Sequence, residues 1–211
     1  YKNYDIESIK EFPKVITEIK GLRGLNVTIP YKEEIIPYLD KLSKTAKKIG
    51  AVNCVTISKK KKLKGYNTDY HGFKKSIKPL LKDHHKKALI LGTGGASKAI
   101  AYALRSLKIE YDFVSRTADE FQYKYEELDA SIFEEYTVII NTTPVGTHPN
   151  VNDCPNLDYS LFTKKHIAYD LIYNPEETAF LRKAKAQGAV TKNGYEMLVL
   201  QAEKAWKIWN E

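Results

Sequence analysis

The sequence is poor in the features that mark secreted, metal-binding and membrane-spanning proteins. Its 211 residues include only two cysteines, Cys54 and Cys154, whose wide separation matches neither a disulfide framework nor the spacing of a zinc site. No apolar run approaches the roughly 20 residues that a membrane helix needs, and no basic-then-apolar leader opens the chain. We therefore expect a cytoplasmic protein that binds neither a metal ion nor a membrane.

The net charge of +8 arises from 34 Lys and Arg residues against 26 Asp and Glu residues, and the two signs are interleaved along the chain. A nucleic-acid surface gathers its basic residues on one face, so this pattern favours no nucleic-acid partner. The one basic run, Lys59–Lys62, lies between two strand-like segments, Ala51–Ser58 and Leu63–Asn67, and is typical of a solvated hairpin tip. With 43% hydrophobic residues, the chain has enough apolar surface for a sizeable core.

From Lys86 onward, short apolar runs alternate with helical periods, which is typical of βαβ units around a parallel sheet. The pattern predicts strands at Lys87–Leu91, Tyr111–Val114, Val138–Asn141 and Ile167–Leu171, and helices at Ser97–Leu107, Glu176–Gln187 and Tyr195–Trp209. The region before residue 70 differs, since an amphipathic stretch over Lys32–Ile49 leads into the hairpin. We predict an α/β protein of two lobes, with a substrate lobe first and a nucleotide lobe second.

A glycine-rich loop supports the second lobe. Gly92, Thr93, Gly94, Gly95 and Ala96 directly follow one predicted strand and precede a predicted helix. Glycines there permit a tight turn and close approach to a pyrophosphate, while the helix N-terminus offers free N–H groups. This context predicts a Rossmann-like, doubly wound parallel sheet that binds a dinucleotide; a purely structural turn is the alternative.

The following strand ends in Ser115, Arg116 and Thr117, where a site for NAD usually carries an acidic residue that accepts from the ribose hydroxyl. Arg116 suits a 2′-phosphate instead, because its planar guanidinium can hold a phosphate with two hydrogen bonds. NADP is therefore the expected cofactor, with NAD possible. An ordinary surface arginine is the alternative.

Three polar clusters come at the ends of strand-like stretches, at Asn26–Lys32, Ala51–Asn53 and Gly65–Asp69. Hydride transfer to or from an alcohol needs a group that exchanges the hydroxyl proton and a second group that holds it in place. Lys32 and Asp69 can form such a pair. From spacing alone, Lys32 can equally be a lysine at the start of a helix and Asp69 an N-cap.

Eight motifs in order make the chain resemble the shikimate dehydrogenases over nearly its whole length. They are NVTIPYK (26–32), AVN (51–53), GYNTD (65–69), LGTGGASKA (91–99), SRT (115–117), INTTPVG (140–146), DLIYNPEET (170–178) and NGYEMLVLQA (193–202). The resemblance implies the reversible, NADPH-dependent reduction of 3-dehydroshikimate to shikimate in aromatic amino-acid biosynthesis.

The resemblance also implies roles for single residues. Lys32 corresponds to the catalytic lysine and Asp69 to its partner and a substrate ligand. Further substrate ligands are Thr28, Asn53, Tyr173 and Gln201. The cofactor would meet Gly92, Thr93, Gly94, Gly95 and Ala96 at its pyrophosphate, Ser115, Arg116 and Thr117 at its adenosine, and Thr142, Leu171 and Gly194 at its nicotinamide. Residues 1–68 with 195–211 would form the discontinuous substrate domain, and residues 69–194 the dinucleotide-binding domain.

The chain departs from the family pattern at its start and beside Arg116. Nothing before Asn26 matches the family's opening strand and Ser-x-Ser loop, so we expect the first strand of the substrate domain to be missing. Ser115 replaces an asparagine, and Glu120 stands where a second basic residue is usual. These changes leave open a quinate/shikimate dehydrogenase that uses NAD. A non-catalytic nucleotide-binding module is the other alternative, and either a monomer or a homodimer fits.

Overall fold

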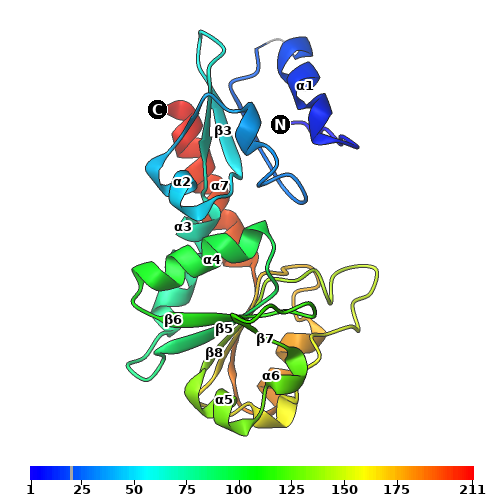
Figure 1. The fold of residues 1–211 in the computed structure, drawn as a ribbon, viewed down its shortest axis with the longest axis vertical. Coiled ribbons are helices and arrows are strands. Elements are labelled where there is room, and N and C mark those ends of the chain that lie inside the picture. The colour runs from blue at the N-terminus through cyan, green and yellow to red at the C-terminus, as the bar shows by residue number, and fades with distance from the viewer. Residues whose placement is uncertain (20) are drawn as a thin grey trace.

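The computed structural model describes residues 1–19 and 21–211 and has two lobes, each built on its own sheet (Figure 1). The small lobe contains a four-stranded sheet in the order β1-β3-β4-β2. Its strands are β1 (Gly24–Asn26), β2 (Lys41–Leu42), β3 (Cys54–Ile57) and β4 (Leu63–Tyr66). β3 and β4 pair in antiparallel fashion around the Lys59–Lys62 turn, which confirms the predicted hairpin.

The amphipathic stretch Lys32–Ile49 is not a single element. It contains a turn, the 3-10 helix η2 (Ile36–Tyr38), β2 and the helix α2 (Lys44–Ile49). Pro37 lies in η2, and Ser43 begins α2 by accepting a hydrogen bond from the backbone N–H of Ala46 at 3.1 Å. The helix α1 (Phe12–Glu18) follows the 3-10 helix η1 (Ile9–Glu11) and buries Phe12 in the hydrophobic core of the small lobe. Apolar residues of the stretch such as Ile35 and Ala46 are buried, as its amphipathic pattern predicts, but Pro37 and Ser43 divide it into separate elements.

The large lobe contains a six-stranded sheet, parallel throughout, in the order β10-β9-β8-β5-β6-β7. Its strands are β5 (Lys87–Leu91), β6 (Glu110–Val114), β7 (Gln122–Tyr123), β8 (Val138–Asn141), β9 (Ile167–Asp170) and β10 (Val190–Lys192). The chain leaves β5 in one direction towards β7 and returns to β8 on the other side. This is the Rossmann strand order, and ligands bind such sheets where the order reverses, beyond the ends of β5 and β8.

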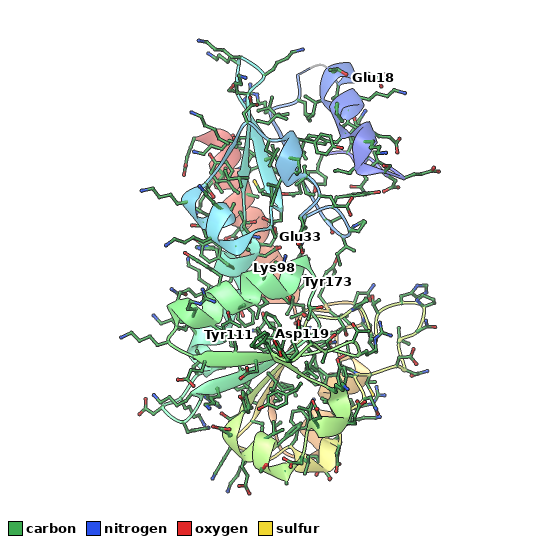
Figure 2. The ribbon with its side chains drawn as sticks, viewed as in Figure 1. Glu18, Glu33, Lys98, Tyr111, Asp119 and Tyr173 are labelled. Atoms are coloured by element: carbon green, nitrogen blue, oxygen red, sulfur yellow. The ribbon has the colours of Figure 1, made fainter. Side chains whose placement is uncertain are left out.

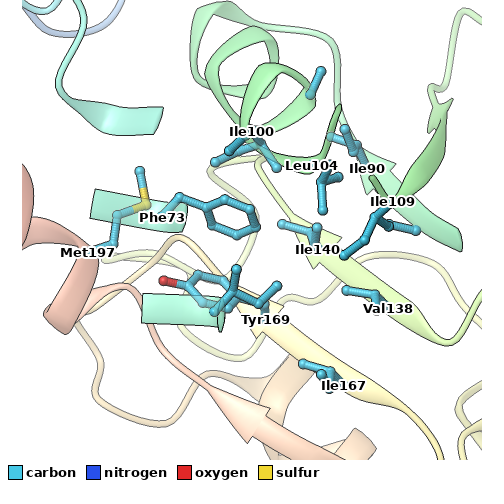
Figure 3. Packing of buried hydrophobic residues seen from close by; sticks show 14 residues of the cluster. Phe73, Ile90, Ile100, Leu104, Ile109, Val138, Ile140, Ile167, Tyr169 and Met197 are labelled. Carbon is cyan, nitrogen blue, oxygen red and sulfur yellow. The ribbon is translucent and has the colours of Figure 1, made fainter. Parts of the chain in front are cut away.

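Alternate residues of the central strands enter two separate cores. On one face Ile90, Ile140 and Tyr169 pack with Phe73 and Met197, as Figure 3 shows. Leu89, Ile139 and Ala168 point to the other face. The first face is covered by α3 (Asp69–Ile77), α4 (Gly95–Ser106) and α7 (Tyr195–Asn210), and the second by α5 (Ala130–Glu135) and α6 (Ala179–Ala186). Burial on both faces explains why these strands read as continuous apolar runs.

The main predicted elements are present, with shifted ends. β5 and β8 have the predicted bounds, and β6, β9, α4 and α7 differ by one or two residues. α6 begins later than predicted, because the Thr178 hydroxyl accepts from the N–H of Leu181 and caps the helix there. Among the described residues, no helix has both the length and the hydropathy to cross a bilayer.

α3 and α7 pack so closely that a side chain at Gly72 has no room. A Cβ atom at this position would lie 2.5 Å from the Met197 carbonyl oxygen and 3.1 Å from the backbone nitrogen of Gln201. We expect Gly72→Ala to lower the free energy of unfolding by about 1–3 kcal/mol, since the helices must move apart. Urea denaturation measures this loss. Gly21→Ala is the control. A Cβ atom there has nothing within 4 Å but the backbone is left-handed, so a loss of stability in this variant has a conformational cause and not a steric one. Equal stability of Gly72→Ala and the parent would contradict the tight contact.

Candidate active site between the lobes

A cavity of about 570 Å³ lies where the two lobes meet, lined by residues from both. It brings together ten of the residues that the sequence singled out: Thr28, Lys32, Asn53, Asp69, Ala96, Thr142, Leu171, Tyr173, Gly194 and Gln201. These residues span most of the chain. The remaining predicted residues, Gly92–Gly95 and Ser115–Thr117, do not line this cavity and lie beyond the ends of β5 and β6.

Lys32 and Asp69 form a close ion pair in the cavity. The Lys32 Nζ atom lies 2.7 Å from Asp69 Oδ2, and their side chains are only 14% and 8% exposed. The Lys32 carbonyl accepts from the N–H of Val52 at 2.7 Å, which fixes the lysine to the small lobe. Asp69 is not the N-cap of α3. It is the first residue of that helix, preceded by Thr68, and its carboxylate faces the lysine.

An amide network holds the other oxygen of this carboxylate. Asn53 donates from Nδ2 to Asp69 Oδ1 at 2.8 Å, and its Oδ1 accepts from the N–H of Thr68 at 2.6 Å. Gln201 of α7 accepts from the Thr68 hydroxyl at 3.2 Å. Lys32 and Asn53 therefore bond the carboxylate directly, and Gln201 contacts Asn53 and Thr68 beside it. This arrangement orients Lys32 beside the cavity, where Thr28 and Gln201 also line the wall.

The wall contains a polar residue to which the sequence had assigned no role. Asn26 donates from Nδ2 to the Tyr1 hydroxyl at 3.1 Å, while its buried Oδ1 accepts no hydrogen bond among the described residues. Asn26 opens the same motif that contains Thr28 and Lys32, which was the available signal. Tyr173 lies at the rim, where it is about half exposed.

The glycine loop lies at the reversal of strand order. Gly92 has a φ of +98°, and a Cβ atom there would lie 2.9 Å from Thr143 Cγ2, so only glycine fits. Gly94 precedes α4 in extended conformation, with open space around it, and no side chain caps this helix. The first N–H groups of α4 are therefore available to an anion, and these residues fit the pyrophosphate of a dinucleotide.

The Ser115–Thr117 segment follows β6, next to the glycine loop along the same edge of the sheet. The N–H of Ser115 donates to the Tyr123 carbonyl at 2.9 Å, which joins the segment to β7. Arg116 and Glu120 both have exposed side chains. The half-buried Tyr125 hydroxyl has a raised pKa because of burial, partly offset by the positive charge of Arg116.

A buried carboxylate supports the large-lobe side of the cavity, and sequence reasoning missed it. Asp170, at the end of β9, accepts from the Thr178 hydroxyl at 2.6 Å, from Asn141 Nδ2 at 3.0 Å and from the N–H of Ile172 at 3.1 Å. Burial raises the pKa of Asp170 from 3.8 to about 6, although these hydrogen bonds oppose the shift. The network shapes the turn that carries Leu171 and Tyr173 into the cavity.

This raised pKa predicts a pH-dependent stability. The folded protein holds the Asp170 proton at a pH where the unfolded chain has lost it, so this group's contribution falls as pH rises from about 4 to about 6. Relative to Asp170→Asn, which cannot titrate, the parent protein should lose about 3 kcal/mol over that range. Urea denaturation of both proteins between pH 4 and pH 7 measures the difference. A difference that is constant with pH would contradict the assignment.

Comparisons with known proteins agree with this geometry. The family model described as the shikimate dehydrogenase substrate binding domain matches residues 1–55. Shikimate dehydrogenase (NADP(+)) from Carboxydothermus hydrogenoformans is 40% identical, over 95% of this chain and 77% of its own. The crystal structure of shikimate dehydrogenase from Aquifex aeolicus matches with a TM-score of 0.84 at 39% identity, over 96% of this chain and 78% of that one.

A third similar protein is shikimate 5-dehydrogenase from Thermus thermophilus, solved in complex with NADP(H) and shikimate. It matches with a TM-score of 0.82 at 34% identity, over 96% of this chain and 78% of that chain. A Rossmann-type lobe and a smaller lobe around one shared cavity, with an ion pair in its wall, define a two-lobed, nucleotide-dependent dehydrogenase. The chain belongs to the shikimate dehydrogenase family, which confirms both the resemblance seen in its motifs and the predicted fold class.

Proposed function

We propose that this protein is a shikimate dehydrogenase that reversibly reduces 3-dehydroshikimate to shikimate with NADPH. The observation that supports this most directly is the buried pair of Lys32 and Asp69 in a cavity shared by both lobes. Relatives at about 40% identity over most of the chain are NADP(+)-dependent shikimate dehydrogenases. They do not favour quinate oxidation with NAD or a non-catalytic role.

The proposed chemistry needs one proton and one hydride. NADPH, when bound, supplies the hydride. In the reductive direction the Lys32 ammonium donates a proton to the oxygen of the substrate carbonyl, and in the oxidative direction the neutral lysine takes the hydroxyl proton. Asp69 holds Lys32 Nζ at 2.7 Å and so orients the lysine amino group for proton transfer. Thr28, Asn53, Tyr173 and Gln201 would bind the substrate.

The cofactor is assigned to the carboxyl edge of the large sheet. Gly92–Ala96 would hold the pyrophosphate at the start of α4, and Ser115–Thr117 the adenosine with its 2′-phosphate. Thr142, Leu171 and Gly194 would border the nicotinamide. The cavity lining supports this last group, since these three residues lie on the large-lobe side, across from Lys32.

We extend the proposal to the domain boundaries, the cellular location and the oligomeric state of the protein. Residues 1–68 with 195–211 would form the substrate domain, and residues 69–194 the dinucleotide domain. The hydrogen bond from Trp209 Nε1 in α7 to the Val55 carbonyl in β3 supports the first grouping. A cytoplasmic location agrees with the two free cysteines. Either a monomer or a homodimer fits.

A turnover assay on the full-length protein tests the proposal. Shikimate and quinate are each supplied with NADP⁺ or NAD⁺, and formation of the reduced nucleotide is followed by its absorbance. We expect the highest kcat/KM for shikimate with NADP⁺. Turnover no faster than that of Lys32→Ala with every combination would refute the enzyme, and a preference for quinate with NAD⁺ would refute the substrate.

A further inference from the structure

One stripe of α4 faces the small lobe. Gly95, Lys98, Ala99 and Tyr102 follow the i, i+3, i+4, i+7 spacing of a single helix face. Ala99 is fully buried in a cluster with Ile49 and Ala51 of the small lobe, and Tyr102 packs in the same cluster. The helix that begins at the glycine loop is therefore also the surface on which the small lobe rests.

The first turn of this stripe meets the segment that carries Lys32. A Cβ atom on Gly95 would lie 3.3 Å from Lys32 Cβ and 3.6 Å from Glu33 Oε1. The Lys98 ammonium donates a hydrogen bond to Glu33 Oε2, and Figure 2 shows both side chains at the junction of the lobes. Glu33 directly follows Lys32 and accepts from the N–H of Ile36 through its carbonyl at 3.1 Å. The carboxylate is thus part of the same turn as the lysine.

This ion pair contributes little to stability. The two side chains are about 40% exposed, and exposed pairs are worth at most about 1 kcal/mol. Its location matters more than its energy, because it joins two functional elements that belong to different lobes. A displacement of the N-terminus of α4 would reach Lys32 through the close approach of Gly95 to the Lys32 side chain and through one ion pair. Proton transfer depends steeply on such displacements.

We propose that Glu33 and Lys98 are positioning residues that hold the Lys32 turn and the N-terminus of α4 in a fixed relation, so that the cofactor site and the catalytic lysine are coupled. This inference rests on the proposed function, since it concerns the same reaction. Neither residue has a role in the chemistry itself. Each acts through its neighbour, Glu33 through Lys32 and Lys98 through the glycine loop.

Glu33→Gln, Lys98→Met and the double variant test the coupling. We expect each single change to lower kcat about tenfold, with KM for shikimate within about twofold of the parent. The double variant should lose no more than either single variant, because both remove one interaction. Lys98→Arg keeps the cation and should stay close to the parent. The matched control is Glu135→Gln, which removes the nearer of the two acidic partners of Lys87, in another partly exposed pair at the other end of the sheet.

Titration with NADP⁺ gives a readout that does not need turnover. Removing the negative charge of Glu33 would tighten binding of an anionic cofactor if only charge mattered. Positioning predicts the opposite sign, so Glu33→Gln should weaken NADP⁺ binding about threefold or more. Unchanged or tighter binding, or a kcat equal to that of the parent, would overturn the inference. An inactive parent that still binds NADP⁺ would refute the proposed function alone, and the titration would still decide the role of Glu33.

Discussion

Replacement of Lys32 by alanine is expected to lower kcat by about 10²-fold or more, with little change in KM for shikimate. General acid–base groups typically contribute this much, and in the proposed reaction the lysine acts on the oxygen that changes its protonation. Asp69 would remain in place, because Asn53 holds its other oxygen. Steady-state kinetics with shikimate and NADP⁺ measure the effect.

Lys62→Ala is the matched control for this experiment. Lys62 pairs with Asp40 at the same 2.7 Å, but its side chain is 72% exposed and lies outside the cavity. Its loss should leave kcat unchanged. An unaltered kcat in Lys32→Ala, or an equal loss in both variants, would remove Lys32 from the reaction.

Replacement of Arg116 by alanine is expected to weaken NADP⁺ binding by about 5- to 150-fold and to leave NAD⁺ binding unchanged. One charge-assisted contact with a phosphate at an exposed site is worth about 1–3 kcal/mol, which corresponds to this range. Only NADP⁺ carries the 2′-phosphate, so the ratio of the two affinities reports on the contact. Calorimetric titration with each nucleotide measures both affinities.

Two further variants frame this result. Arg105→Ala removes another arginine, at the end of α4 that lies opposite the glycine loop, and should change neither affinity. Glu120→Lys should favour NADP⁺, because a positive charge replaces one that repels the phosphate. The gain should be only a few-fold, since Glu120 is exposed and salt screens its charge. Equal losses for NADP⁺ and NAD⁺ in Arg116→Ala would contradict a contact with the 2′-phosphate.

The sequence predicts the centre of the large lobe well and its edges poorly. β5 and β8 are buried on both faces, so their apolar runs are unbroken and their ends are sharp. β7 has two residues and β10 has three, too few to show any period. The Asn174-Pro175 pair predicts too early a start for α6, because the Thr178 cap decides where the helix begins.

In the candidate site, too, the sequence predicts what local patterns show and misses what tertiary contacts bring together. Lys32 and Asp69 stood out because charged residues ended polar motifs, and the glycine loop stood out by its position between a strand and a helix. Tyr173 and Gln201 were indicated by family resemblance alone, because nothing in local sequence joins residue 53 to residue 201. The buried Asp170 network also depends on tertiary contacts, and no spacing links Asn141, Asp170 and Thr178.

The position of α7 implies an order of assembly. The contact between Asn53 and Gln201 closes 148 residues of chain, and the one between Val55 and Trp209 closes 154. Closing so long a loop in a flexible chain costs entropy before any contact repays it. Once the six-stranded sheet has formed, however, α3 and α7 lie side by side on it through Phe73 and Met197. The large lobe therefore shortens the loop that these contacts must close, and we expect the pocket between the lobes to be completed after the sheet has formed.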